Sequence, residues 1–208
     1  MDFFLILSYI TTLYGLVNAT LYLKSLIRDN RALRFFTLYL IIIGIIQLAS
    51  IVIGKVFHQP NLFLSHFYFI SQFVLLTLFY NELLQFKRIK VVLWGVLLFI
   101  GYQFISDPEI FFRYNPLGMA ITNAIIVVYA ILYFYKSLTA SRGFIIVNIG
   151  VFFYLLSSTL IFASGNLVLD LGLSEKMNFY LINVNRVLYL LLQILITLEW
   201  YRNYRRKQ

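Results

Sequence analysis

The sequence predicts an all-α integral membrane protein with seven transmembrane helices, its N-terminus outside the membrane and its C-terminus in the cytoplasm. Three observations lead to this class. The 208 residues are 62% hydrophobic and only 12% charged, whereas a soluble domain is nearer half apolar and a quarter charged. The apolar residues form seven runs, and a helix needs roughly 17–25 such residues to cross a hydrocarbon core. The basic residues gather in alternate connections between those runs.

The seven runs are separated by short polar segments such as RDNR, HQPN and TASRG, whose residue types are typical of turns. The first run has no cationic start and no small-residue cleavage site, so we expect a retained helix rather than a signal peptide. The fourth run is the shortest. Asn115 and Pro116 give the fifth run a capping side chain followed by proline in its first turn. The predicted spans are, in order, Phe3–Leu23, Phe35–Gly54, Phe63–Leu84, Ile89–Ile105, Leu117–Tyr135, Phe144–Ala163 and Phe179–Trp200, and we expect them to form one domain over residues 1–208.

The distribution of basic residues predicts the orientation. Thirteen of the seventeen lysines and arginines lie in the first, third and fifth connections and in the C-terminal tail, which the positive-inside rule places in the cytoplasm. We therefore expect a multi-pass protein of the cytoplasmic (inner) membrane of a bacterium, with the lipid bilayer as its solvent. The net charge of +9 is a topology signal, and no nucleic-acid partner is expected. The basic loops and the tail EWYRNYRRKQ suit anionic lipid, or a cytoplasmic or membrane protein partner.

Polar residues share one face in several spans, because each helical residue turns by about 100°. One such stripe in the first span contains Ser8, Thr11, Thr12, Gly15, Asn18 and Tyr22, and one in the last span contains Asn183, Arg186, Gln193 and Thr197. In the sixth span a line of small residues passes through Gly150. Small residues and side-chain amides are typical of helix–helix contacts in membranes, and a polar cavity would need the same residues. Both interpretations stay open.

A set of polar residues lies at one depth, about 6–10 residues or roughly 10–15 Å from the outer ends of the spans. The candidate ligand-binding residues are Gln47, Gln72, Thr122, Asn123, Asn183 and Arg186. An arginine near the centre of a bilayer costs about 2.5–3.5 kcal/mol, and no carboxylate is predicted at its level. Amides, hydroxyls, water or a small anionic ligand would have to satisfy it, unless the guanidinium reaches to the outer interface.

Catalytic and metal-binding patterns do not occur in the sequence. It has no cysteine, no glycine-rich phosphate loop and no nucleophile–base pair, and no histidine stands at a metal-ligand spacing from an acidic residue. We expect neither an enzyme nor a cofactor. The two histidines, His58 and His66, are expected to be polar surface.

One segment resembles known proteins. Asn61–Leu84, NLFLSHFYFISQFVLLTLFYNELL, resembles a segment of small seven-helix bacterial membrane proteins of uncharacterised function, and is similar to membrane input modules of sensor histidine kinases. The resemblance implies a receptor-like or accessory signalling subunit that works with a separate partner, since the predicted tail is too short for a kinase domain.

Two further functions stay open. LYLKSL and YFYKSL place Lys24 and Lys136 in matching positions 112 residues apart, as in the 3+1+3 parallel repeats of SWEET and PQ-loop transporters. The first of these functions is therefore a small-molecule transporter, and the second is a structural subunit of a membrane complex.

Overall fold

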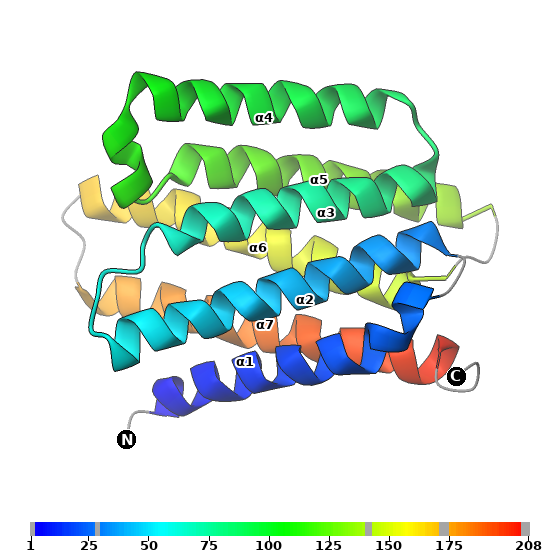
Figure 1. Cartoon of the computed structure of the whole chain (residues 1–208), viewed down its shortest axis with the longest axis horizontal. Coiled ribbons are helices and arrows are strands. Elements are labelled where there is room, and N and C mark those ends of the chain that lie inside the picture. The colour runs from blue at the N-terminus through cyan, green and yellow to red at the C-terminus, as the bar shows by residue number, and fades with distance from the viewer. Residues whose placement is uncertain (1–2, 28–29, 140–142, 171–174, 205–208) are drawn as a thin grey trace. The chain divides into compact units, whose positions relative to one another are not determined.

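The computed structural model describes residues 3–27, 30–139, 143–170 and 175–204, and for 3–5, 162–170, 175–179 and 181–182 it describes the backbone alone. Within these residues the chain consists of helices joined by short connections and contains no strand (Figure 1). The α-helices are α1 (Phe3–Tyr22), α2 (Arg31–Ile51), α3 (Leu64–Leu84), α4 (Arg88–Ser106), α5 (Pro116–Ser137), α6 (Ile145–Asp170) and α7 (Glu175–Asn203). The short helical segments are η1 (Leu23–Ile27), η2 (Val52–Val56) and η3 (Pro108–Phe112). Each predicted span corresponds to one α-helix, which confirms the all-helical class.

Several helices are long and apolar enough to cross a membrane, judged by length and composition. Among the described residues these are Ile6–Ile27, Arg31–Val56, Leu64–Leu84, Arg88–Ser106 and Pro116–Ser137, and a shorter apolar stretch is Ile145–Ile161. Large apolar side chains also lie on the outside of the helices; on α4, Trp94 is 64% and Leu98 73% exposed. A surface of this kind suits a lipid solvent. These findings indicate a membrane protein, whereas seven crossings, their direction and the inner membrane stay predictions.

The ends of the helices differ from the predicted spans where hydrogen bonds, rather than hydropathy, set the boundary. The sequence interpretation began the second span at Phe35, but α2 begins at Arg31, because the Asn30 side chain accepts a hydrogen bond from the Leu33 N–H at 3.0 Å. The predicted cap of α5 is confirmed. The Asn115 side chain accepts from the Gly118 N–H at 2.8 Å, and Pro116 is the first helical residue.

The chain divides into two compact units. Unit 1 contains Met1–Tyr22 and Asn123–Gln208, and unit 2 contains Leu23–Thr122. The helix α5 begins in unit 2 and continues in unit 1. The single domain predicted for residues 1–208 stays a prediction, and each unit is described by itself.

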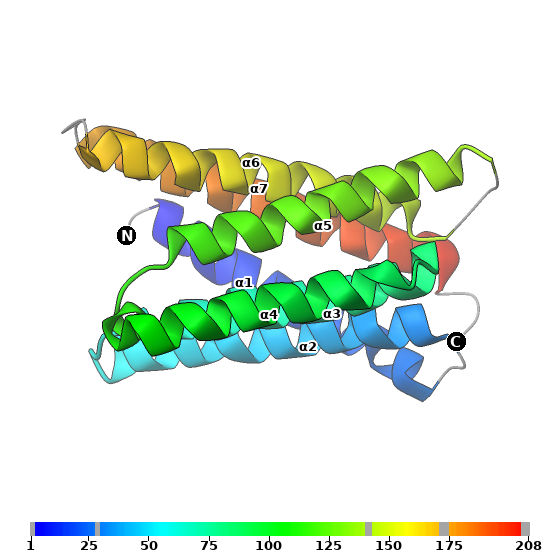
Figure 2. The same ribbon diagram turned by 90° about the horizontal axis from the view of Figure 1, so that it is seen from above.

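In unit 1, α7 contacts both α1 and α6 (Figures 1 and 2). The contact with α6 is close at Gly150, where a Cβ atom would lie 2.9 Å from Leu192 Cδ1 and 3.2 Å from Leu195 Cδ1. Since a side chain there would push into both leucines, the glycine lets the two helices approach. The small-residue line predicted for the sixth span is thus a helix contact at Gly150.

In unit 2, α2 contacts α3, α3 contacts α4, and α4 contacts η3 (Figure 2). The α2–α3 contact contains buried aromatic rings, with the centroids of Phe36 and Phe79 5.3 Å apart. The helix α3 ends at Leu84, and the next residue, Gln85, has a φ of 57°, in the left-handed region that commonly terminates helices. At this end of the unit, the start of α2, the end of α3 and the start of α4 line a common pocket.

Candidate functional site

A buried polar seam joins α1 and α7 in unit 1. Asn18 Nδ2 donates to Gln193 Oε1 at 2.8 Å and to the Gln193 backbone carbonyl at 2.9 Å. Thr197 Oγ1 donates to Asn18 Oδ1 at 2.7 Å, and the Tyr22 hydroxyl donates to the Ile196 carbonyl at 3.1 Å. The polar stripes predicted for the first and last spans therefore face each other over these residues, and their groups are satisfied by helix contact.

A buried carboxylate caps the start of α6. Glu199 of α7 is fully buried, and its two oxygens accept from the Phe144 N–H at 2.9 Å and the Ile146 N–H at 3.1 Å. Asn203 Nδ2 donates to the same carboxylate. The first N–H groups of a helix have no partner in the helix itself, and they carry a partial positive charge, so Glu199 acts as a cap contributed by another helix.

The backbone at this cap has an uncommon conformation. Phe144 has a φ of 66°, in the left-handed region that a bulky residue rarely adopts. It is held from three sides: Glu199 accepts from its N–H, its ring lies 5.6 Å from that of Tyr204, and the Tyr133 hydroxyl donates to the neighbouring Gly143 carbonyl. No pattern in the sequence predicted this arrangement.

The six residues predicted to bind a ligand fall equally into the two units. Unit 1 contains Asn123, Asn183 and Arg186, and unit 2 contains Gln47, Gln72 and Thr122. That all six meet in one cavity stays a prediction. Gln72, Thr122, Asn123 and Asn183 are buried, while Gln47 and Arg186 are half-buried.

Two of these six are joined to each other. Arg186 Nη1 donates to Asn183 Oδ1 at 3.1 Å, one turn earlier on α7. The structure therefore brings together the arginine and the amide predicted to share a face. Thr122, in contrast, donates to carbonyls of its own helix, at Gly118 and Met119, which is how hydroxyls in apolar helices are commonly satisfied.

His66 corrects the expectation of polar surface. It is 1% exposed, and its ring lies among those of Phe69, Phe104 and Phe111. Its Nε2 donates to the Arg113 carbonyl at 2.9 Å, since a carbonyl accepts. The histidine thus joins the segment after η3 to the start of α3 by a hydrogen bond. Its surroundings in the sequence did not indicate this tertiary contact.

A pocket with a basic lining lies in unit 2, at the end where α2 and α4 begin. Its volume is about 440 Å³, within the range of roughly 300–1,000 Å³ usual for small-molecule sites. The lining comes from α2, α3 and α4, and consists of Arg31, Arg34, Phe35, Leu38, Leu78, Asn81, Glu82 and Lys90. Three cations and one carboxylate give it a net positive charge.

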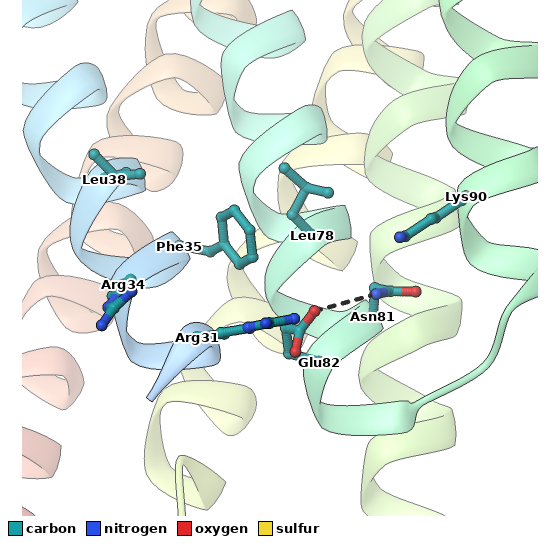
Figure 3. A pocket seen from close by; sticks show the side chains of 8 residues that line it. All are labelled: Arg31, Arg34, Phe35, Leu38, Leu78, Asn81, Glu82 and Lys90. Atoms are coloured by element: carbon teal, nitrogen blue, oxygen red, sulfur yellow. Dashed lines mark hydrogen bonds between the residues drawn. The ribbon is translucent and has the colours of Figure 1, made fainter. Parts of the chain in front are cut away.

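Figure 3 shows how these side chains lie. Arg31 extends from α2 toward Glu82 at the end of α3, and Lys90 points back from α4 toward Asn81. The Asn81 amide donates to Glu82 Oε1 at 3.5 Å, a long hydrogen bond. Phe35 and Leu78 lie between α2 and α3, on the inner side of the charged groups (Figure 3). The pocket therefore has a charged end and an apolar end.

Sequence reasoning assigned these cations to cytoplasmic loops and a partner surface, and missed that they share a pocket. The available signal was that all three cations lie at the starts of predicted spans, with Arg31 and Arg34 just before Phe35–Gly54 and Lys90 in the first turn of Ile89–Ile105. In the part of the chain that the structure describes, no group of three His, Cys, Asp or Glu residues could hold a metal ion.

The all-helical fold and the apolar helix surfaces are those of a protein suited to a membrane. The chain matches no family model, no curated protein and no solved structure. Its function must therefore be inferred from its own residues and their geometry.

Proposed function

We propose that the chain is a seven-span protein of the bacterial inner membrane, with its N-terminus outside, that works without catalysis as a receptor-like or accessory signalling subunit. The orientation rests on the basic residues, which gather where α2 and α4 begin and where α7 ends. A small anionic ligand at the outer half and a protein partner at the cytoplasmic face are parts of the same proposal.

The observation that carries the ligand-binding role is the Arg186–Asn183 pair in α7. A guanidinium inside an apolar helix costs about 2.5–3.5 kcal/mol on insertion scales, so such residues generally serve a function. The amide one turn away accepts a hydrogen bond from the guanidinium, at the depth where the sequence predicts a polar layer. Polar groups nearer the cytoplasmic end of α7 are committed to α1 and to the start of α6. This division of roles supports a binding function for the outer half alone.

A transporter with two three-helix repeats is the alternative that the sequence left open. Such a repeat would group the first three helices as one bundle. Here α1 belongs to the compact unit of α6 and α7, and α2 and α3 to the other unit. This partition gives the repeat no support. A purely structural subunit has no observation in its favour beyond the polar seam.

Two measurements test the proposal. Reporter fusions after Lys90 and after Arg142 are expected to be cytoplasmic, and a fusion within residues 107–115 external; an external reporter at Lys90 would overturn the orientation. Copurification from native membranes, with mass spectrometry, is expected to recover a cytoplasmic or membrane partner with the wild type. Movement of a solute into proteoliposomes containing the chain alone would instead establish the transporter.

A further inference from the structure

The pocket of unit 2 has a composition that neither helix stability nor helix contact requires. Arg31 and Arg34 lie in the first turn of α2, and Arg88 and Lys90 in the first turn of α4, with no acidic residue in either turn. The start of a helix carries a partial positive charge, so cations there are destabilising where acidic residues would be favourable. The starts of these two helices therefore line one pocket, into which Arg31 and Lys90 point, while the Arg34 head lies on the other side of α2 (Figure 3).

We propose that this pocket binds the headgroup of an anionic phospholipid, with the phosphate held by Arg31 and Lys90 and the start of an acyl chain against Phe35, Leu38 and Leu78. The phosphate would offset the charge of these two cations and of the two helix starts. Basic pockets between membrane helices on the cytoplasmic side are suited to such headgroups. The inference rests on the proposed membrane insertion and orientation, and not on a receptor role.

The apolar end of the pocket favours a lipid over a free phosphate ion. Leu38 follows Arg31 by seven residues of α2, which at 1.5 Å per residue is about 10 Å along the helix axis. Leu78 lies a similar way into α3 from its end at Leu84. Inorganic phosphate would leave this apolar surface empty, whereas a lipid anchored by its phosphate would cover it with hydrocarbon.

The remaining polar groups suit a headgroup that has hydroxyl donors. Glu82 and Asn81 offer acceptor oxygens beside the cations (Figure 3). Phosphatidylglycerol combines one negative phosphate with a glycerol that donates hydrogen bonds. It is therefore the probe of choice, with phosphatidylcholine, whose phosphate is balanced by a cationic choline, as the counterpart of zero net charge.

The test measures lipid binding to the purified full chain in detergent by native mass spectrometry. Wild type is expected to retain one phosphatidylglycerol in preference to phosphatidylcholine. The double variant Arg31→Gln/Lys90→Gln is expected to bind phosphatidylglycerol about 30-fold more weakly, since each cation contributes about a factor of five near an anionic headgroup. The matched control Lys24→Gln/Arg202→Gln removes the same charge from exposed positions outside the pocket and is expected to bind as wild type.

A third variant is expected to change the affinity for phosphatidylglycerol in the opposite direction. Glu82→Gln removes the one negative charge from the lining, so phosphatidylglycerol is expected to bind a few-fold more tightly. A variant that merely damaged the fold would not do this, which keeps the proposal testable if the double variant is unstable.

Three results would overturn the proposal. Equal binding of phosphatidylglycerol and phosphatidylcholine would show that the pocket does not recognise the net charge of the headgroup. Displacement of the lipid by inorganic phosphate would indicate a free-anion site. Loss of a copurifying protein in the pocket variant, with lipid binding unchanged, would assign the pocket to an acidic protein partner. Since the lipid site rests on the proposed orientation, an external reporter at Lys90 would overturn both proposals. Copurification of a partner without lipid retention would overturn the lipid site alone, and lipid retention without a copurifying partner would overturn the receptor role alone.

Discussion

The Glu199 cap gives the sharpest prediction about stability. Substituting Glu199→Ala leaves the N–H groups of Phe144 and Ile146 without their acceptor in a buried place. A hydrogen bond to a charged group contributes about 1.5–3 kcal/mol, so losing two is expected to lower the free energy of unfolding by about 3–5 kcal/mol. Glu199→Gln keeps one acceptor oxygen and turns an amide toward the other N–H. It is expected to lower the free energy of unfolding by about half as much as Glu199→Ala.

The measurement is unfolding of the purified chain in detergent, combined with hydrogen exchange of the peptide around residues 143–146. Both variants should speed exchange of the Phe144 and Ile146 amides. The control is Glu82→Gln, which changes a half-buried carboxylate and is expected to alter stability by no more than about 0.5 kcal/mol. If Glu199→Gln matched that control in stability and in exchange, the cap would not contribute as argued.

Three other substitutions test the remaining contacts in unit 1. Asn18→Leu should lower the free energy of unfolding by about 1–2 kcal/mol, because it leaves the Gln193 amide buried without its partner; a neutral effect in detergent unfolding would contradict the seam. Gly150→Val should destabilise by about 1–3 kcal/mol through overpacking, while Gly95→Val, where nothing lies within 4 Å, should not. Arg186→Leu should lower stability by about 1–3 kcal/mol if the guanidinium and Asn183 organise a polar cavity. Increased stability of that variant would show that the guanidinium only reaches for the interface.

Hydropathy was sufficient to predict the helices, and insufficient to predict where they end. Burial in lipid depends on the composition of long runs, which the sequence states directly. A helix start depends on one capping bond, as at Asn30, which moves α2 four residues ahead of its predicted span. Asn115 was predicted as a cap because asparagine before proline is a strong local signal.

The polar faces of α1 and α7 could be predicted from periodicity, but their pairing could not. A stripe gives the angle of a face and not the helix opposite, so contact and cavity were both open. The structure shows Asn18 hydrogen-bonded to Gln193 and Thr197, so these residues of the two stripes form a helix contact. Arg186 and Asn183 are on the same predicted stripe, yet bond to each other along α7.

Glu199 and His66 were missed for one physical reason. Each is satisfied by backbone groups, and backbone groups are the same for every residue type. The N–H groups that Glu199 accepts from are 55 and 53 residues away in sequence, and His66 donates to a carbonyl 47 residues away. No pattern of side chains marks such a partner, so long-range caps of this kind appear only once the helices are assembled.

The starts of α2, α4 and α6 together give the strongest reason to expect an anion at the basic pocket. Each of these helix starts has N–H groups that find no acceptor within the helix itself. Each therefore favours a negatively charged group nearby. At α6 the chain supplies a carboxylate from α7, and that carboxylate is buried with two backbone donors. At α2 the Asn30 side chain, which is neutral, caps the helix, and Arg31 and Arg34 lie in the first turn; at α4, Arg88 and Lys90 lie in the first turn. Glu82 is the one carboxylate in the pocket lining, beside Arg31, Arg34 and Lys90, so the lining keeps a net positive charge that an anion from the surroundings would offset. In a membrane, the phosphate of an anionic lipid is the abundant group of that charge at the level of helix ends.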